Sequence, residues 1–137
     1  MNIAVDSPSV PETIYLKDYT PPVFSVNSID LDIQVFDTYT EVTAKLDMQR
    51  QHAGNLILLG RDLELKSIKI NGQALSSEQY QLDSEQLTVA DAPDHAIVET
   101  VVIIHPESNT QLEGLYKAGD DLFVTQNEPE GFRKITV

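Results

Sequence analysis

The fold of this chain is constrained most by two neighbouring segments in which apolar and polar residues alternate with a period of two. In residues 28–35 the apolar positions are Ile29, Leu31, Ile33 and Val35, and in residues 42–48 they are Val42, Ala44, Leu46 and Met48. Because successive side chains of a β-strand point to opposite faces of the sheet, each segment predicts a half-buried strand. The intervening Asp37-Thr38 predicts a turn, so the two strands are expected to form a hairpin or part of a meander.

Turn-forming residues divide the rest of the chain into further short strands. The apolar run 55–60 lies between turn residues and predicts a strand buried on both faces. A further apolar stretch with Leu65, Ile68 and Ile70 leads to Asn71-Gly72, which is a strong hairpin signal. Short strands are also predicted at 79–83, 86–89 and 96–105. No segment shows a sustained helical period, and the predicted strands, about seven or eight, indicate an all-β fold, an antiparallel β-sandwich or a strongly bent sheet.

Composition limits the classes of function. The chain has 137 residues, of which 41% are hydrophobic, enough for one domain with a single core. With 22 acidic against 9 basic residues, its formal net charge of −13 argues against nucleic acid or an anionic membrane surface as a partner. No cysteine is present, so disulfides, thiolate catalysis and Cys-ligated zinc are excluded. The opening residues lack the features of a secretory signal, and no apolar run approaches the roughly 18 residues of a membrane span.

The last part of the chain, residues 109–136, departs from this plain alternation. It places three glycines, Gly114, Gly119 and Gly131, among three aromatic residues, Tyr116, Phe123 and Phe132. Recurring glycines predict a backbone that bends at fixed points. Asp120-Asp121, directly after the second glycine, is expected to form a turn. Residues 125–133 are expected to be extended, because Pro129 lacks a backbone donor and biases Glu128 toward extended conformations.

Two motifs in this stretch resemble a known family. The run N-T-x-L-E-G-L-Y-x-x-G-D begins at Asn109, and the run T-Q-x-E-x-E-G-F-R-x-I-T begins at Thr125. Together they resemble the N-terminal domain of the aminopeptidase N family, in its bacterial alanyl-aminopeptidase branch, and residues 15–22 resemble the start of the same domain. Members of this family are gluzincin zinc metallopeptidases that remove single residues from the N-termini of peptides.

The resemblance implies a saddle-shaped, mostly antiparallel β-domain and a cytoplasmic location. It divides the chain into an extended N-terminal segment, residues 1–22, and a β-domain, residues 23–137, that forms the front part of the family's N-terminal domain. The catalytic domain is expected to follow beyond Val137 and to be absent from this chain. The family more often has an aromatic residue at the position of Val137. Because of the resemblance, the parent protein is expected to be a zinc-dependent aminopeptidase.

The chain itself carries no recognisable catalytic motif. A zinc peptidase of this type needs H-E-x-x-H on a helix, which places two imidazoles and a glutamate beside the metal-bound water. His52, His95 and His105 have no partner at helical spacing, and each is expected at a turn or a strand end. Asp30 and Asp32 are expected to form a solvated strand face rather than a metal site. The family's G-A-M-E-N motif is also missing, so we expect the chain to be inactive alone and to hold no cofactor, with zinc belonging to the parent enzyme by resemblance.

The resemblance also assigns substrate-binding roles to two residues. In the family's T-Q-x-E-x-E-G-F-R run, the glutamine lines the pocket for the first side chain of the substrate, and the glutamate two residues later binds its free α-amino group. Position by position, these roles fall on Gln126 and Glu128. A carboxylate is a natural acceptor for an ammonium, and residues i and i+2 of an extended segment face the same side. The alternative for Glu128 is one more exposed acid in an acidic chain. Glu130 and Arg133 are expected to form a local ion pair or an interdomain contact.

A different class of function stays open. Without a catalytic domain, an acidic β-sandwich can be a stand-alone binding or adhesion module for carbohydrate or protein. Such modules usually show exposed aromatic residues or calcium-binding acids at their loop tips, whereas only 7% of the residues here are aromatic. The expected partners are therefore the N-terminus of a peptide substrate and the catalytic domain of the same parent chain. Self-association is also expected, because uncovered strand edges and apolar surface tend to find partners.

Overall fold

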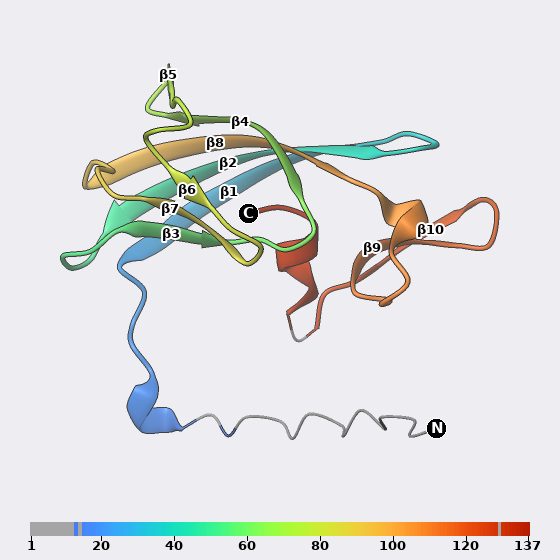
Figure 1. The fold of residues 1–137 in the computed structure, drawn as a ribbon, viewed down its shortest axis with the longest axis horizontal. Helices are drawn as coiled ribbons and strands as arrows, with labels where there is room; N and C mark the ends of the chain where they lie inside the picture. The colour runs from blue at the N-terminus through green and yellow to red at the C-terminus, as the bar shows by residue number, and fades with distance from the viewer. Residues whose placement is uncertain (1–12, 14, 129) are drawn as a thin grey trace, which may run out of the picture.

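The computed structural model describes residues 13, 15–128 and 130–137, and within these ranges it contains ten β-strands and three short 3-10 helices (Figure 1). The 3-10 helices are η1 (Leu16–Asp18), η2 (Pro106–Ser108) and η3 (Gly131–Lys134). Every strand pair is antiparallel. The predicted all-β, antiparallel class is confirmed, and the strands that the sequence did not predict as separate elements are β9 and β10.

The largest sheet has five strands in the order β1-β2-β8-β4-β5. Their bounds are Phe24–Val35 for β1, Thr40–Arg50 for β2, His95–Ile104 for β8, Glu64–Ile70 for β4 and Gln73–Ala74 for β5. The long strands β1, β2 and β8 run side by side and curve together along the length of the molecule (Figure 1). The predicted hairpin of the first two strands is confirmed, since β1 pairs with β2 from Phe24 opposite Arg50 to Val35 opposite Thr40.

Two smaller sheets complete the fold. The three-stranded sheet has the order β3-β7-β6, with β3 at Leu56–Leu59, β7 at Gln86–Val89 and β6 at Gln81–Leu82. The third sheet is the hairpin of β9 (Gly114–Ala118) and β10 (Leu122–Gln126), which lies at the opposite end of the large sheet from β3 (Figure 1). The three-stranded sheet therefore lies near one end of the large sheet, and the β9–β10 hairpin lies near the other end.

The core consists of two clusters on one face of the large sheet. The first lies between the five-stranded and three-stranded sheets and includes Leu46, Leu56, Leu87, Val98 and the C-terminal Val137. The second joins the large sheet to the C-terminal region and contains Val42, Val102, Ile104, Leu115 and Ile135. Complete burial of a side chain such as Leu56 contributes about 1.5–3 kcal/mol to stability, so these clusters supply the main favourable term of folding.

Two of the turns that the sequence predicts are present in the structure. Asn71 and Gly72 have φ angles of 51° and 81° and join β4 to β5, as the hairpin signal predicted. The Asn71 side chain donates to the His95 carbonyl at 3.2 Å and accepts from the Ile97 amide at 2.8 Å, which ties this turn to β8. The predicted turn at Asp120-Asp121 is also confirmed, between β9 and β10.

The run 55–60 forms the predicted strand β3, but the expectation that it is buried on both faces is wrong. Leu56 and Leu58 are buried, whereas Ile57 and Leu59 are exposed. The reason is that the three-stranded sheet is an outer layer, and only its inner face packs on the large sheet. An apolar run by itself does not distinguish this case from a central strand.

The expectation of a half-buried first strand is also wrong in one respect. The strand β1 is present, but Ile29, Leu31, Ile33 and Val35 are all exposed. β1 is the edge strand of the large sheet, and the covering layers within the described part of the chain do not extend over it.

The predicted N-terminal segment, residues 1–22, falls largely on residues 1–12 and 14, which lie outside the described residues. Its remaining part contains η1 and leads into β1 at Phe24. The division of the chain at residues 22 and 23 thus stays a prediction. None of the helices in the described ranges has the length and apolar character needed to cross a membrane.

Candidate functional site

The two predicted substrate-binding residues lie where β10 passes into η3. Gln126 is the last residue of β10 and is paired with Gly114 of β9. Glu128 lies in the turn that follows, and the Gly131 amide closes this turn by donating to the Asn127 carbonyl at 2.9 Å. Gln126 and Glu128 therefore lie on either side of the point where β10 ends and the turn begins.

The expectation that residues 125–133 are extended is wrong. The strand ends at Gln126, the chain turns, and η3 begins at Gly131. The argument that Gln126 and Glu128 face one side of a strand therefore does not apply. The conformation of Pro129, on which the expectation relied, lies outside the described residues. Both predicted side chains are exposed in this chain.

Two glycines bring η3 against the base of the β9–β10 hairpin. A Cβ atom at Gly131 would overlap the Gln126 carbonyl oxygen and would lie 2.8 Å from the Gly114 amide nitrogen. Gly114 has a φ of +74°, and a Cβ there would lie 2.9 Å from Cβ of Lys134. Neither position has room for a side chain without moving backbone, so these glycines set the geometry of the turn that carries Glu128.

Lys134 is a buried cation at the end of η3 that sequence reasoning missed. Its side chain is 4% exposed. Its ammonium donates to the Gln111 side-chain carbonyl and lies 3.4 Å from the Asp62 carboxylate and 3.9 Å from that of Glu113. A buried charge requires such partners. In the sequence, a single lysine before Ile135 has no pattern that distinguishes it from a surface lysine.

Further hydrogen bonds hold the segments around η3 together. The Asn109 side chain donates to the carbonyls of Glu113 at 2.6 Å and Leu115 at 3.0 Å. The Arg61 amide donates to the Arg133 carbonyl at 2.8 Å, which connects η3 to the loop between β3 and β4. Arg133 also pairs with Glu130 at 2.8 Å, so the predicted local ion pair is confirmed.

A pocket of about 320 Å³ lies beside Lys134. Its lining includes Asp62, His105, Asn109 and Gln111 but neither of the predicted substrate-binding residues. The described part of the chain therefore does not enclose Gln126 and Glu128 in that pocket.

The three histidines lie at turns or strand ends, as predicted. His52 contacts the Pro21 carbonyl at 3.2 Å, and His105 contacts the Thr38 carbonyl at 3.2 Å. His95 lies 2.7 Å from the Asp47 carboxylate, and this hydrogen bond is the main cause that holds the pKa of Asp47 below its ordinary value. Among the described residues, no three His, Cys, Asp or Glu side chains lie close enough together to hold a metal ion.

No protein-family model matches the chain, but curated proteins do. Aminopeptidase N of Caulobacter vibrioides is 42% identical over 128 residues, covering 92% of this chain and 15% of that protein. Aminopeptidase N of Haemophilus influenzae is 42% identical over 127 residues, covering 89% of this chain and 14% of that protein. The Escherichia coli protein of the same name is 36% identical over 128 residues, covering 92% of this chain and 14% of that protein. The chain is therefore homologous to part of aminopeptidase N.

Solved structures agree with the predicted family. The chain is similar to Legionella pneumophila aminopeptidase A, crystallised in complex with aspartic acid, with a TM-score of 0.79 and 26% identity. The match covers 88% of this chain and 15% of that structure. An M1 zinc metallopeptidase of Deinococcus radiodurans shares the fold, with a TM-score of 0.66, at 16% identity, covering 82% of this chain and 28% of that structure.

The relatives are much longer than this chain, and this limits which of their properties can be assigned to it. The chain spans 14–15% of the length of these curated relatives. The antiparallel β-structure corresponds to the N-terminal domain of M1 aminopeptidases. The similarity favours a peptidase domain over a stand-alone binding module, whereas the catalytic activity of the relatives belongs to much longer proteins.

Proposed function

We propose that this chain is the non-catalytic N-terminal β-domain of a zinc aminopeptidase, in which Glu128 binds the free α-ammonium of a peptide substrate and Gln126 lines the pocket for its first side chain. The observation that carries the proposal is the similarity to aminopeptidase N over 92% of the chain. By the family resemblance, the setting we propose is the cytoplasm. The partners are the peptide N-terminus and the catalytic domain of the same polypeptide.

The geometry of the turn suits an anchor for a charged group. The Gly131–Asn127 hydrogen bond and the close approach of Gly131 to Gln126 hold both ends of the segment that carries Glu128. A carboxylate on a restrained turn loses little conformational freedom when it binds a ligand. Its exposure in this chain leaves it accessible to a substrate held between this domain and another, and sites often form at such junctions.

The chemistry separates the roles of the two residues. The Glu128 carboxylate accepts a charge-assisted hydrogen bond from the substrate ammonium, worth roughly 1.5–3 kcal/mol. Exclusion of water by a covering domain strengthens such a bond. The Gln126 amide is uncharged and both donates and accepts, so it affects which first residue is preferred rather than whether an N-terminus binds.

In the proposed enzyme, the zinc ion would be held by residues of the catalytic domain and not by residues of this chain. It would act there as a Lewis acid toward the substrate carbonyl and a water molecule. This chain's own contribution is to bind and orient the N-terminus. We therefore expect the purified chain to cleave no aminoacyl reporter and to bind no stoichiometric zinc. One tightly held zinc per chain in elemental analysis, or turnover that persists through stringent purification, would contradict this division of roles.

The role of Glu128 is tested in the full-length enzyme by Glu128→Gln, with kcat/KM measured on several aminoacyl substrates. We expect kcat/KM to fall by about ten- to a hundredfold, at 1.4 kcal/mol per decade, with most of the loss shared by all substrates. Gln126→Ala should instead change the order of preference among first residues. Glu130→Gln, a neighbouring exposed acid that pairs with Arg133, is the matched control and should stay near the parent. If Glu128→Gln leaves every kcat/KM within about twofold of the parent, the anchor role is wrong.

A further inference from the structure

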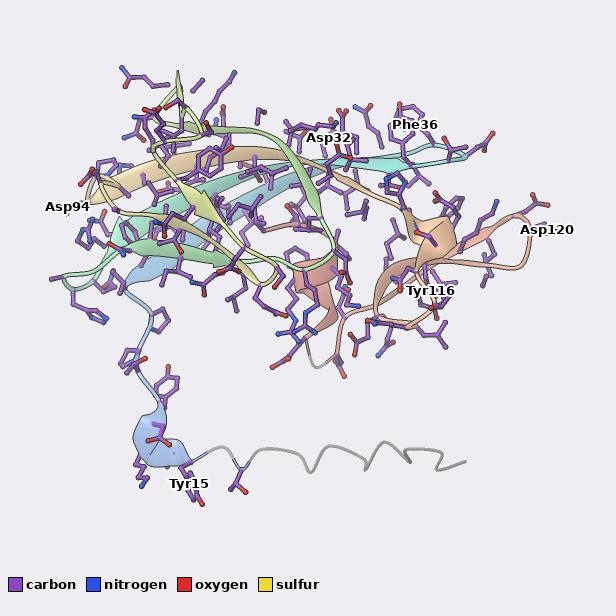
Figure 2. All side chains as sticks on the ribbon, viewed as in Figure 1. Tyr15, Asp32, Phe36, Asp94, Tyr116 and Asp120 are labelled. Carbon is purple, nitrogen blue, oxygen red and sulfur yellow. The ribbon has the colours of Figure 1, made fainter. Side chains whose placement is uncertain are left out.

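The β9–β10 hairpin, which carries Gln126, is positioned by contacts at its base. The hairpin projects from the rest of the molecule, with Asp120 at its far tip (Figure 2). At its base, β9 contacts η2 and η3, and Gly114 pairs with Gln126. The turn between β10 and η3 carries Glu128, and we call it the anchor turn. The position of Glu128 relative to Gln126 therefore depends on how η3 is held against the base of the hairpin.

Lys134, at the end of η3, is tied back to the start of the same hairpin. Its ammonium donates to the Gln111 side-chain carbonyl and lies 3.9 Å from the Glu113 carboxylate. Both partners lie just before Gly114, the first residue of β9. At the other end of η3, the Gly131 amide closes the anchor turn. The chain therefore leaves the hairpin, passes through the anchor turn and η3, and is joined again to the beginning of the hairpin by one side chain.

The segments that Lys134 contacts have an uncommon backbone conformation. Leu112, which lies between the two hairpin partners, has a φ of 58°, in the left-handed region. Asp62, whose carboxylate lies 3.4 Å from the same ammonium, also has a φ of 58°. A leucine seldom adopts this conformation, and such residues persist only where the surrounding contacts hold them. Because such residues gather at functional sites, their position around one buried cation favours a role for Lys134 beyond packing.

Stability alone does not require a charge at this position. The Lys134 side chain is 4% exposed, and Ile104 and Leu115 line the pocket beside it, so apolar neighbours are at hand. Buried ionic groups that are replaced as a whole by apolar residues often leave a protein no less stable. An apolar side chain has no N–H groups, whereas an ammonium has three and can fix several partners relative to one another. The lysine therefore suits a defined arrangement of η3 and residues 111–113.

We propose that Lys134 is a positioning residue for the substrate anchor. It holds η3 against residues 111–113 and thereby fixes the Glu128 carboxylate relative to Gln126. Lys134 does not touch the substrate in this role, and the inference rests on the proposed function of Glu128. A restrained carboxylate loses less conformational freedom when it binds the substrate ammonium. Loss of the restraint therefore weakens the binding of the N-terminus and leaves the chemical step unchanged.

The test compares three variants of the full-length enzyme, with kcat and KM measured separately on several aminoacyl substrates. Lys134→Met should raise KM for every substrate by about three- to tenfold and leave kcat within about twofold of the parent. Gln111→Ala removes the hydrogen bond from the hairpin side and should raise KM in the same way. Because Gln111 is exposed, this variant decides the outcome if Lys134→Met does not fold. Lys66→Met, in which an exposed ion pair with Glu64 is lost, is the matched control and should leave KM unchanged.

A double-mutant cycle tests whether Lys134 acts through Glu128. In the Glu128→Gln enzyme the anchor is already lost, so adding Lys134→Met should lower kcat/KM by no more than about a further twofold. Adding Gln111→Ala should have an equally small effect. If the losses instead multiply, each side chain acts independently of Glu128 and the inference is overturned.

The remaining outcomes separate this inference from the proposed function. If Glu128→Gln alone leaves kcat/KM unchanged, the anchor role fails, and the positioning role fails with it. If Glu128→Gln lowers kcat/KM but Gln111→Ala leaves KM within about twofold of the parent, the anchor stands and only the positioning role is wrong. A fall of kcat in Gln111→Ala with an unchanged KM would also overturn the inference. An unfolded fraction of enzyme lowers the apparent kcat and not KM, so a raised KM distinguishes positioning from a loss of folded protein.

Discussion

The ammonium of Lys134 lies 3.4 Å from the carboxylate of Asp62, which joins the end of η3 to the loop between β3 and β4. The two ends of this contact differ in environment, because the Lys134 side chain is 4% exposed and that of Asp62 is 71% exposed. The cation is therefore held inside the domain while its acidic partners reach in from the surface. The same region carries the turn with Glu128, so the contact connects domain stability to the proposed anchor.

Lys134→Met should destabilise the chain by about 1–3 kcal/mol. The apolar stem of the side chain is retained, but the hydrogen bond to Gln111 and the contacts with Asp62 and Glu113 are lost. The cost stays below that of breaking a fully buried ion pair, because the remaining carboxylates can be solvated. Urea unfolding at neutral pH measures the difference.

Lys66→Met is the matched control for this prediction. Lys66 also pairs with an acid, Glu64, at 2.6 Å, but both side chains are more than half exposed. Exposed pairs contribute about 0–1 kcal/mol. If the two variants lose equal stability, Lys134 is no more than another surface lysine.

Gly131→Ala should cost more stability than Gly119→Ala, although only Gly119 has a positive φ, of +68°. A Cβ at Gly119 meets no atom within 4 Å, so its cost is backbone strain of about 1–2 kcal/mol. A Cβ at Gly131 meets backbone atoms of Gln126 and Gly114, so η3 must move away from the hairpin, at a cost of about 3 kcal/mol. Thermal or urea unfolding of both variants decides the order. A smaller loss for Gly131→Ala would show that this close approach is easily relaxed.

The lowered pKa of Asp47 predicts how the folding stability of the chain depends on pH. The hydrogen bond from His95 holds the pKa of Asp47 below its ordinary value in the folded chain. A carboxyl whose pKa is lowered by folding contributes stability above its unfolded pKa and loses that contribution as the pH falls through the folded pKa. The parent chain should therefore be more stable than Asp47→Asn at pH 5, and the difference should shrink below about pH 4. Asp30→Asn serves as the control on the neighbouring strand. A difference between parent and Asp47→Asn that stays constant down to pH 3 would contradict this assignment.

The elements that sequence predicted correctly are those whose cause is local. The alternation in residues 42–48 gives β2 its buried face, because a strand has a period of two in any context. Asn71-Gly72 forms its hairpin because both residues tolerate positive φ. The motif match identified the family because it depends on the order of residues and not on their conformation.

The features that sequence did not predict depend on distant parts of the chain. Whether Ile57 is buried is decided by how many layers cover the three-stranded sheet, which no local pattern records. The segment 125–133 turns at Gln126 because Gly131 packs against the backbone of β9 and β10. Lys134 is buried because Asp62 and Gln111 approach it from other segments. In each case tertiary contacts override the local expectation.

The exposed apolar side chains of β1 (Ile29, Leu31, Ile33 and Val35) form a row on one face of the strand, and together with the charge of the chain they predict salt-dependent self-association. The row offers apolar surface that favours contact between copies, whereas a net charge of −13 and the acids Asp30 and Asp32 oppose it. Salt screens the repulsion between exposed charges, with a Debye length of about 10 Å at 0.1 M and about 3 Å at 1 M, and it leaves the apolar attraction intact. We therefore expect sedimentation to show a monomer at low salt and growing association as the salt concentration rises. Leu31→Ser/Ile33→Ser should reduce the association, whereas Asp30→Asn/Asp32→Asn should strengthen it at low salt. A monomer at high protein concentration that is insensitive to salt would show that the exposed apolar side chains of β1 do not attract a second copy.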